Sequence, residues 1–382
     1  MNNNPTEKEF TCPTVIMGDM GSGKSTVLVQ HALNVAKSGQ SAVLFVDNDY
    51  LLDLIAKANS SVQSVPCDIW DFSSSEVLEH FALTLNVEQA AETSISILDT
   101  ASTIDRLYQL YLAILQDSNE YSLNDGSKAL LAAACKVVFT KPNQTFYQLY
   151  QFLNDDDIRK AYLENVSLDN SPLLNAHELD LLNGLSAGHR TSVMSNLSIL
   201  ARFNPVFRDF RVKTLLSNMP SSTYHLSQVF EPGKLTVFYF PRLKYTAEVR
   251  DLLTSLLTFN LQLIQETKRT SSRPMHLMYD EIFQTPKTLK LLTRSLNHFS
   301  RSNFYVTITL FDYNYASKFL DALLPYQPEF IFLTKPKSYT LYSLNLEHMK
   351  PAVKALNWDR FQSLRLNAGT TAVVLNQIPA LN

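Results

Sequence analysis

The sequence has few cysteines, and they show no spacing that suggests a shared site. Cys12, Cys67 and Cys135 are the only three among 382 residues, and none belongs to a CxxC pair. Neither a disulfide framework nor a cysteine zinc site is therefore expected, and the composition suits a reducing compartment. The eight histidines form no cluster with metal-ligand spacing either. His276 alternates with apolar residues, which predicts a core histidine instead of a ligand.

The sequence also lacks a long apolar run, a signal sequence and an excess of one charge. No run of about 18 apolar residues occurs, and residues 1–5 lack the basic and apolar segments of a signal peptide. The formal net charge is only −3, so the chain as a whole is not attracted to nucleic acid. We therefore expect a cytoplasmic protein without a membrane span, in which any DNA contact comes from local basic groups or from a ring of subunits.

What the sequence does contain is enough apolar material for a large core. Hydrophobic residues make up 45% of the chain and aromatic residues 11%, and no internal repeat or low-complexity tract occurs. Near the N-terminus, an apolar run at 14–17 precedes a glycine loop, a helical pattern at 25–37 and a second apolar run at 42–46. This order of strand, loop, helix and strand is typical of a βαβ unit in a parallel sheet.

The middle of the chain has a different pattern. Between residues 75 and 215, apolar residues recur at helical spacing with almost no strand signal, and expected helices include 145–166 and 174–203. Strand-like runs return afterwards, at 234–240, 275–279, 304–310, 329–333 and 371–375. The predicted fold class is therefore α/β, with a core of mainly parallel central sheet at 1–74 and 216–382 and a large all-α insertion at 75–215.

The segment from Gly18 to Ser25 matches the phosphate-binding pattern GxxxxGK[ST] in full, between an expected strand and an expected helix. Glycines let backbone N–H groups converge on phosphates, and the helix N-terminus adds positive potential. Lys24 is expected to reach the β- and γ-phosphates, Ser25 to place its hydroxyl on Mg²⁺, and Thr26 to contact the α-phosphate. The predicted binding residues for ATP with Mg²⁺ are Gly18, Asp19, Met20, Gly21, Ser22, Gly23, Lys24, Ser25 and Thr26. The alternative is a chance glycine-rich turn.

A phosphate loop needs an acidic partner on a neighbouring strand, and Asp280-Glu281 is the best candidate because it ends the apolar run 275–279. Asp280 would hold the Mg²⁺ shell through water, and Glu281 would polarise the attacking water as a general base. The alternative is an ordinary strand end with two exposed acids. Asp47 ends the run 42–46 and is a second acid that can face the site, ranked below the pair.

Two arginines follow the acidic strand and are candidate catalytic residues. Arg294 lies on the expected helix 286–300, and Arg301 immediately precedes the expected strand 304–310. An arginine at the edge of a nucleotide site can neutralise γ-phosphate charge across a subunit boundary. A solvated helix face explains either arginine equally well, and Arg301 is the better candidate of the two.

A basic and aromatic segment at 190–213 has two interpretations. Its residues are Arg190, Arg202, Phe203, Phe207, Arg208, Phe210, Arg211 and Lys213. Basic groups interleaved with aromatic rings suit a nucleic-acid surface. An amphipathic helix with a core stripe and a charged face explains the same residues, and we favour it.

With these features in order, the chain resembles the HerA/FtsK group of P-loop motors, nearest to the type IV secretion and conjugation ATPases (TraG/TraD coupling proteins and TraC-like ATPases). The likeness spans roughly 14–375 and depends on the order of motifs. After the phosphate loop come an acid-ended strand, the segments 67–72, 188–195 and 200–205, the strand 235–240 and the acidic pair. It implies a RecA-like core in an ATP-hydrolysing ring, a homohexamer, that translocates DNA or a protein–DNA substrate with secretion or conjugation machinery as its partner.

Two departures from that group affect what we expect. Its members carry membrane helices or a large domain before the motor, so this chain is expected to be a bare motor, docked at the inner face of the membrane through partners. The group also places a γ-phosphate-sensing glutamine where this chain has Asp312, and an ionised acid cannot donate a hydrogen bond to phosphate. A viral genome-packaging ATPase and a nucleotide-binding assembly subunit without translocase activity are therefore alternatives.

Overall fold

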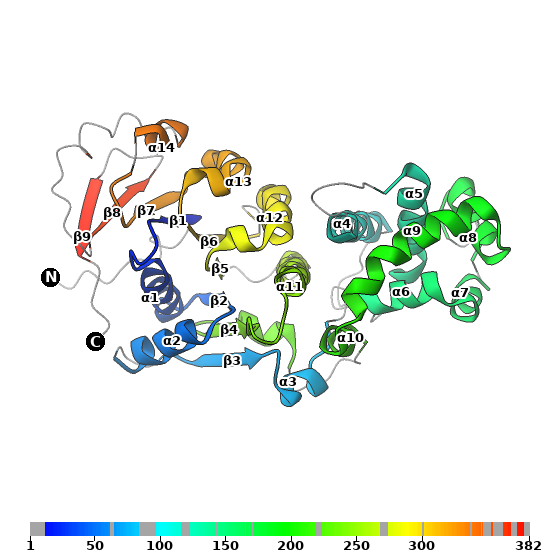
Figure 1. Cartoon of the computed structure of the whole chain (residues 1–382), viewed down its shortest axis with the longest axis horizontal. Helices are drawn as coiled ribbons and strands as arrows, with labels where there is room; N and C mark the ends of the chain where they lie inside the picture. The colour runs from blue at the N-terminus through cyan, green and yellow to red at the C-terminus, as the bar shows by residue number, and fades with distance from the viewer. Residues whose placement is uncertain are drawn as a thin grey trace. The chain divides into compact units, whose positions relative to one another are not determined.

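The computed structural model describes residues 12–61, 65–83, 97–115, 123–141, 144–164, 166–167, 169, 171–217, 224–267, 274–299, 302–336, 338–344, 346, 353, 362–367 and 373–377. The chain forms two compact units, one of residues 1–74 with 226–382 and one of residues 75–225 (Figure 1). Within the described residues, no helix combines the length and the apolar character that crossing a membrane requires.

The first unit is built on one sheet, to which the described residues contribute nine strands in the order β3-β4-β2-β5-β6-β1-β7-β8-β9. The strands are β1 (Thr14–Met17), β2 (Ser41–Val46), β3 (Cys67–Asp71), β4 (Leu235–Tyr239), β5 (Met275–Tyr279), β6 (Phe304–Leu310), β7 (Glu329–Phe332), β8 (Gln362–Asn367) and β9 (Val373–Gln377). Neighbours from β3 to β7 pair in parallel, whereas β7, β8 and β9 pair antiparallel. The predicted α/β class with a mainly parallel sheet is confirmed.

The central strands are continuous apolar runs because they are buried on both faces. Every residue of β1, β2, β4 and β5 is buried, as expected for parallel strands covered by helices on either side. The helices α1 (Lys24–Lys37) and α2 (Asp49–Ser61) cover one face. The helices α11 (Ala247–Thr267), α12 (Pro286–Phe299) and α13 (Ser317–Leu323) cover the other (Figure 1). A shorter helix, α14 (Ser338–Ser343), precedes β8.

The second unit is helical throughout its described elements. These are α3 (Ser75–His80), α4 (Ile97–Leu115), α5 (Asp125–Val138), α6 (Phe146–Asn154), α7 (Asp156–Leu163), α8 (Ala176–Ser186), α9 (Arg190–Phe207) and α10 (Phe210–Ser217). The helix expected at 145–166 is two helices, because Asp155 ends α6 and caps α7, accepting from Asp157 N at 2.9 Å and Ile158 N at 3.1 Å. The helix expected at 174–203 is also two, divided at Gly188, whose φ is 73°.

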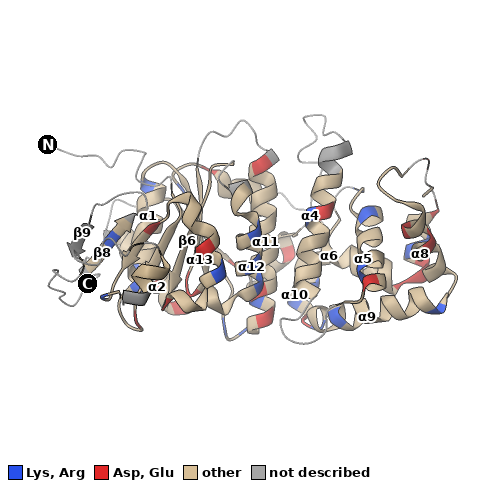
Figure 2. Cartoon of the chain, turned by 90° about the horizontal axis from the view of Figure 1, so that it is seen from above, with Lys and Arg blue, Asp and Glu red and all other residues tan. Residues whose placement is uncertain are grey.

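Aromatic rings form the core of this helical unit. Phe146 stacks on Tyr111 with centroids 4.4 Å apart and lies 4.7 Å from Phe203, which is fully buried. Phe203 therefore belongs to a core stripe, as the amphipathic-helix interpretation of 190–213 requires. Phe210 differs, since it is 67% exposed and has the Arg211 guanidinium 5.3 Å from its ring centroid. Figure 2 shows charges of both signs interspersed over both units.

His276 is a core histidine, as its alternation with apolar residues predicted. It is buried on β5, and its Nε2 lies 2.6 Å from Gln40 Oε1. Buried polar groups need such partners, because an unpaired one would lose its hydration without compensation. The imidazole is therefore part of the interior of the sheet unit.

A carboxylate on α11 caps the start of α12 and fixes these two helices together. Asp251 is 2% exposed and accepts hydrogen bonds from Lys287 N at 2.8 Å and Thr288 N at 2.9 Å. These amides are among the N-terminal donors of α12 that have no partner within the helix. The cap is thus a tertiary contact between elements that are far apart in sequence.

Replacing Asp251 by Ala should lower the free energy of unfolding by about 2 kcal/mol, because it leaves both capped amides buried without acceptors. Asp251→Asn retains one acceptor oxygen and should cause a clearly smaller loss. Urea denaturation of the full chain measures both values. Equal losses for Ala and Asn, or no loss for either, would show that the cap does not stabilise the fold.

Candidate functional site

The phosphate-loop motif forms a tight turn between β1 and α1, where the glycines have structural reasons to be there. Gly21 and Gly23 have φ values of 73° and 91°, which residues with a Cβ rarely adopt. A Cβ added at Gly18 would lie 2.5 Å from Ser22 Oγ and 3.0 Å from Leu333 Cβ. The glycines therefore permit the tight turn that connects β1 to the N-terminus of α1.

Lys24, the first residue of α1, points into this loop. Its side chain is buried, and Nζ donates to Gly18 O at 2.8 Å and Asp19 O at 2.9 Å. The ammonium also lies 4.1 Å from the ring centroid of Phe311, within the range of a cation–π contact. Burial lowers the pKa of Lys24, and the nearby carboxylates of Asp280, Glu281 and Asp19 oppose that change.

The loop fits an anionic ligand. The hydroxyl oxygen of Ser22 is buried, and among the described residues it has no hydrogen-bond partner. A buried hydroxyl in this position is a donor that a phosphate oxygen would satisfy. The Lys24 ammonium and the start of α1 supply positive potential to the same small volume.

The acidic pair follows β5 and reaches the loop across an intervening strand. The expectation of an acid on the strand next to β1 is wrong, because β6 lies between β1 and β5. The loop and the acidic pair nevertheless meet, because Ser25 Oγ donates to Asp280 Oδ2 at 2.8 Å. Ser25 and Asp280 are oxygen ligands of the kind that Mg²⁺ prefers. No cluster of three or more His, Cys, Asp or Glu within the described ranges could hold a metal by itself.

Thr309 lies on β6, the strand between β1 and β5, and it contacts both acids. Its hydroxyl donates to Asp280 Oδ1 at 2.6 Å and accepts from Glu281 N at 2.7 Å. The register explains this position, because Ile308 is paired with Tyr279 and Thr309 is the next residue along β6. The only sign of Thr309 in the sequence is a polar residue near the end of an apolar run, and nothing local connects it with the acids.

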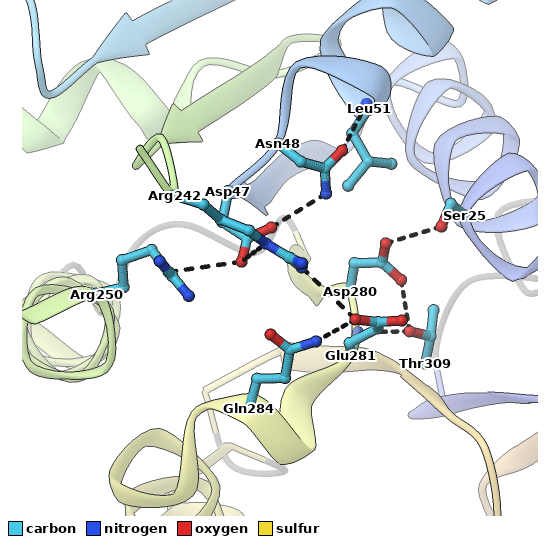
Figure 3. Close-up of polar contacts among 10 residues, drawn as sticks. All are labelled: Ser25, Asp47, Asn48, Leu51, Arg242, Arg250, Asp280, Glu281, Gln284 and Thr309. Carbon is cyan, nitrogen blue, oxygen red and sulfur yellow. Dashed lines mark hydrogen bonds and ion pairs between the residues drawn. The ribbon is translucent and has the colours of Figure 1, made fainter. Parts of the chain in front are cut away.

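Glu281 has a strained backbone conformation, and its half-buried side chain lies among charged groups. Its φ of 47° and ψ of 49° lie in the left-handed region, which non-glycine residues rarely adopt. Its carboxylate accepts from Gln284 Nε2 and lies 3.6 Å from Arg242 Nη2 (Figure 3). Burial and the neighbouring Asp280 raise the pKa of Glu281, and Arg242 and Lys24 oppose that rise.

Asp47, ranked second as an acid of the site, faces two arginines. Its Oδ2 lies 2.8 Å from Arg242 Nε and 3.5 Å from Arg250 Nε (Figure 3). Neither arginine was singled out from the sequence. Arg242 follows β4 and Asp47 follows β2, and these two strands are neighbours. Predicting the contact between the two residues therefore requires the strand order.

Of the two candidate arginines, the structure describes only Arg294. Arg294 lies on α12 with an exposed side chain, near Lys290. Arg301 lies outside the described residues. Asp312 follows β6 at the start of a short 3₁₀ turn, Tyr313–Tyr315, three residues beyond Thr309.

Comparison with known proteins shows similarity in structure alone. No protein-family model matches the chain, and no curated protein matches it. Among solved structures, VirB4 of Thermoanaerobacter pseudethanolicus is similar with a TM-score of 0.58 and 15% identity, over 96% of this chain and 89% of that one. The bacterial conjugative coupling protein TrwB is similar with a TM-score of 0.58 and 14% identity, over 96% and 84%.

The similarity to TrwB extends to its ligand-bound forms. TrwB in complex with ADP and Mg²⁺ aligns with a TM-score of 0.56 and 15% identity, over 96% of this chain and 84% of that one. TrwB has also been solved with the non-hydrolysable ATP analogue ADPNP. At such low identity the likeness establishes the fold, which this chain shares with VirB4 and TrwB, and it confirms the resemblance to secretion and conjugation ATPases at that level.

Replacing Thr309 by Val should lower the free energy of unfolding by about 1–3 kcal/mol, because the Glu281 amide loses its acceptor and the half-buried Asp280 carboxylate loses a donor. Thr309→Ser retains the hydroxyl and should be closer to the wild type. Thermal and urea denaturation of the full chain provide the comparison. A Val variant as stable as the Ser variant would mean that this hydroxyl does not hold the acids.

Proposed function

We propose that this chain is an ATP-hydrolysing motor that works as a ring, a homohexamer, and moves DNA or a protein–DNA substrate in conjugation or type IV secretion. The observation that carries the ATPase part is the contact of Ser25 at the phosphate loop with Asp280, beside Glu281. The fold shared with VirB4 and TrwB over 96% of the chain supports the motor part.

Nucleotide binding in this proposal uses the groups already gathered at the loop. Lys24 exchanges the carbonyls of Gly18 and Asp19 for phosphate oxygens, and the loop amides and the Ser22 hydroxyl donate to others. Ser25 and Asp280 would hold Mg²⁺, which neutralises charge on the phosphates when bound. Asp19, Met20, Gly21, Gly23 and Thr26 complete the proposed binding residues.

Hydrolysis in this proposal uses Glu281 as the base. Its carboxylate takes a proton from the attacking water while the water oxygen bonds to the γ-phosphorus and the bond to the β-phosphate oxygen breaks, giving ADP and phosphate. Thr309 fixes the backbone from which Glu281 extends. Arg294 or Arg301 of a neighbouring subunit is the proposed source of positive charge on the γ-phosphate.

The roles of Lys24 and Glu281 can be separated by two variants. Lys24→Ala should weaken ATP binding by about 10- to 100-fold, because it removes a charge-assisted contact to phosphate. Glu281→Gln should bind ATP normally and hydrolyse it about 100-fold more slowly or worse, because an amide cannot accept the proton. Fluorescent-nucleotide titration measures the first and phosphate release the second.

Turnover of ATP by the wild type distinguishes an ATP-hydrolysing motor from a nucleotide-binding assembly subunit. If the wild-type chain with ATP and Mg²⁺ releases phosphate no faster than Glu281→Gln, the ATPase proposal fails. A nucleotide-binding assembly subunit would then be the better description.

The ring and the DNA substrate require their own test. Sedimentation velocity with ATP and Mg²⁺ should show a species of about six times the 43.3 kDa chain mass, and Lys24→Ala should remain smaller. DNA should bind to the ring with affinity that falls steeply with salt, because a chain of net charge −3 can bind phosphates only through local basic groups. Absence of DNA binding by the ring at low salt would contradict the translocase proposal.

A further inference from the structure

The Glu281 carboxylate is approached by an arginine from a different part of the chain. Arg242 lies between β4 and α11, and its Nη2 is 3.6 Å from Glu281 Oε2. The same guanidinium is closer to Asp47, with Nε 2.8 Å from Oδ2. Arg242 therefore lies between two carboxylates and makes a tight contact with one and a loose contact with the other (Figure 3).

Asp47 is held in place by three groups besides the Arg242 guanidinium. Arg250 Nε on α11 lies 3.5 Å from the same Oδ2, and Asn48 Nδ2 donates to Oδ1 at 3.1 Å. The Arg242 amide also donates to Asp47 O at 2.9 Å. The pKa of Arg242 is raised, chiefly by its hydrogen bond to Asp47, so the guanidinium is fully charged. Asp47 thus fixes both the backbone and the side chain of Arg242.

The strand order explains why these three groups meet. In the sheet β2 lies between β4 and β5, and Asp47, Arg242 and Glu281 each follow the carboxyl end of one of these strands. Parallel strands place such ends at one edge of the sheet. Arg242, which follows β4, therefore contacts an acid at the end of each of the next two strands, Asp47 after β2 and Glu281 after β5.

A general base must be held close to one geometry, and a glutamate side chain has freedom to move away from it. Misplacement of a catalytic group by about 1 Å can reduce a rate by about 100-fold. The planar guanidinium can contact two carboxylates at once. Because Asp47 takes the close contact, Arg242 reaches Glu281 Oε2, which also accepts from Gln284 Nε2, without forming a tight ion pair with it.

We propose that Arg242, anchored by Asp47, is a positioning residue that orients the Glu281 carboxylate toward the attacking water. The proposal rests on the ATPase function proposed above, since it assigns Arg242 an effect exerted through the base. It predicts an effect on the rate of hydrolysis and not on nucleotide affinity. It also predicts that the effect depends on the presence of Glu281.

The test compares steady-state kcat and KM for ATP in the full-length wild type and six variants. They are Arg242→Gln, Arg242→Lys, Asp47→Asn, Lys244→Gln, Glu281→Gln and the double variant Arg242→Gln with Glu281→Gln. Lys244→Gln is the matched control, because it removes a positive charge from an exposed residue of the same segment. The Tm of each variant shows whether it is folded, and single-turnover assays extend the range to the slow variants.

Arg242→Gln should lower kcat by about 10- to 100-fold with KM within about 3-fold of the wild type. Asp47→Asn should lower kcat in the same direction, Arg242→Lys should recover part of the loss, and Lys244→Gln should stay near the wild type. In the Glu281→Gln background, Arg242→Gln should have almost no further effect, because residues that act through one group are not additive.

Three outcomes would overturn the inference while leaving the ATPase proposal intact. The first is a kcat for Arg242→Gln equal to or above the wild type. The second is a raised KM with unchanged kcat, which would mean that Arg242 contacts the nucleotide. The third is a loss that persists in full without Glu281. If Arg242→Gln does not fold, Arg242→Lys and Asp47→Asn decide in the same way. Background turnover by the wild type would instead refute the proposed function itself.

Discussion

The site depends on the two hydrogen bonds that the Thr309 hydroxyl makes with the acidic pair. The strand order places β6 between the strand that leads into the phosphate loop and the strand that ends in the two acids. Without a bridge, one strand spacing would separate the halves of the site. Thr309 donates to the Asp280 carboxylate and accepts from the Glu281 amide, so a single side chain on the middle strand holds the carboxylate of one acid and the backbone of the other. Asp280 can then meet Ser25 across the gap.

Charge balance in a partly buried volume is the second constraint. Burial disfavours the charged forms of Lys24 and Glu281, lowering the pKa of the first and raising that of the second. The two charges stabilise each other. Asp280 and Asp19 also favour the charged form of Lys24, and Arg242 favours that of Glu281, whereas Asp280 and Asp47 oppose the charge of Glu281. The Lys24 ammonium donates hydrogen bonds to two carbonyls of its own loop. A phosphate could replace those carbonyls, which is why the arrangement suits a nucleotide site.

The parts of the fold that the sequence predicted well are those specified locally. The runs at 14–17, 42–46, 275–279 and 304–310 are strands because continuous apolar runs suit strands buried on both faces. The phosphate loop was recognisable because its glycines serve the turn itself. β3 was not identified as a strand, since it lies at the sheet edge and exposes Asp68 and Ile69. β8 was missed because polar residues alternate with Leu364 and Leu366 in an antiparallel pair.

The contacts that complete the site could not be predicted, because they depend on which strands become neighbours. Nothing local shows that β6 lies between β1 and β5, and that order is what brings Thr309 to the acids. The same holds for Arg242, whose meeting with Asp47 and Glu281 requires β4, β2 and β5 to be adjacent. The sequence shows that Thr309 is polar and that Arg242 is charged, but it does not show which residues they contact.

In the proposed function, one site, divided between the phosphate loop and the ends of β5 and β6, holds a nucleoside triphosphate with Mg²⁺. A crystal or cryo-EM structure of the chain with a non-hydrolysable ATP analogue and Mg²⁺ tests it most directly. We expect Lys24 Nζ to leave the Gly18 and Asp19 carbonyls for phosphate oxygens, Ser25 and Asp280 to lie at the metal, and Glu281 to face the γ-phosphate. A loop that stays closed on Lys24 at saturating analogue, or a nucleotide bound elsewhere, would contradict it.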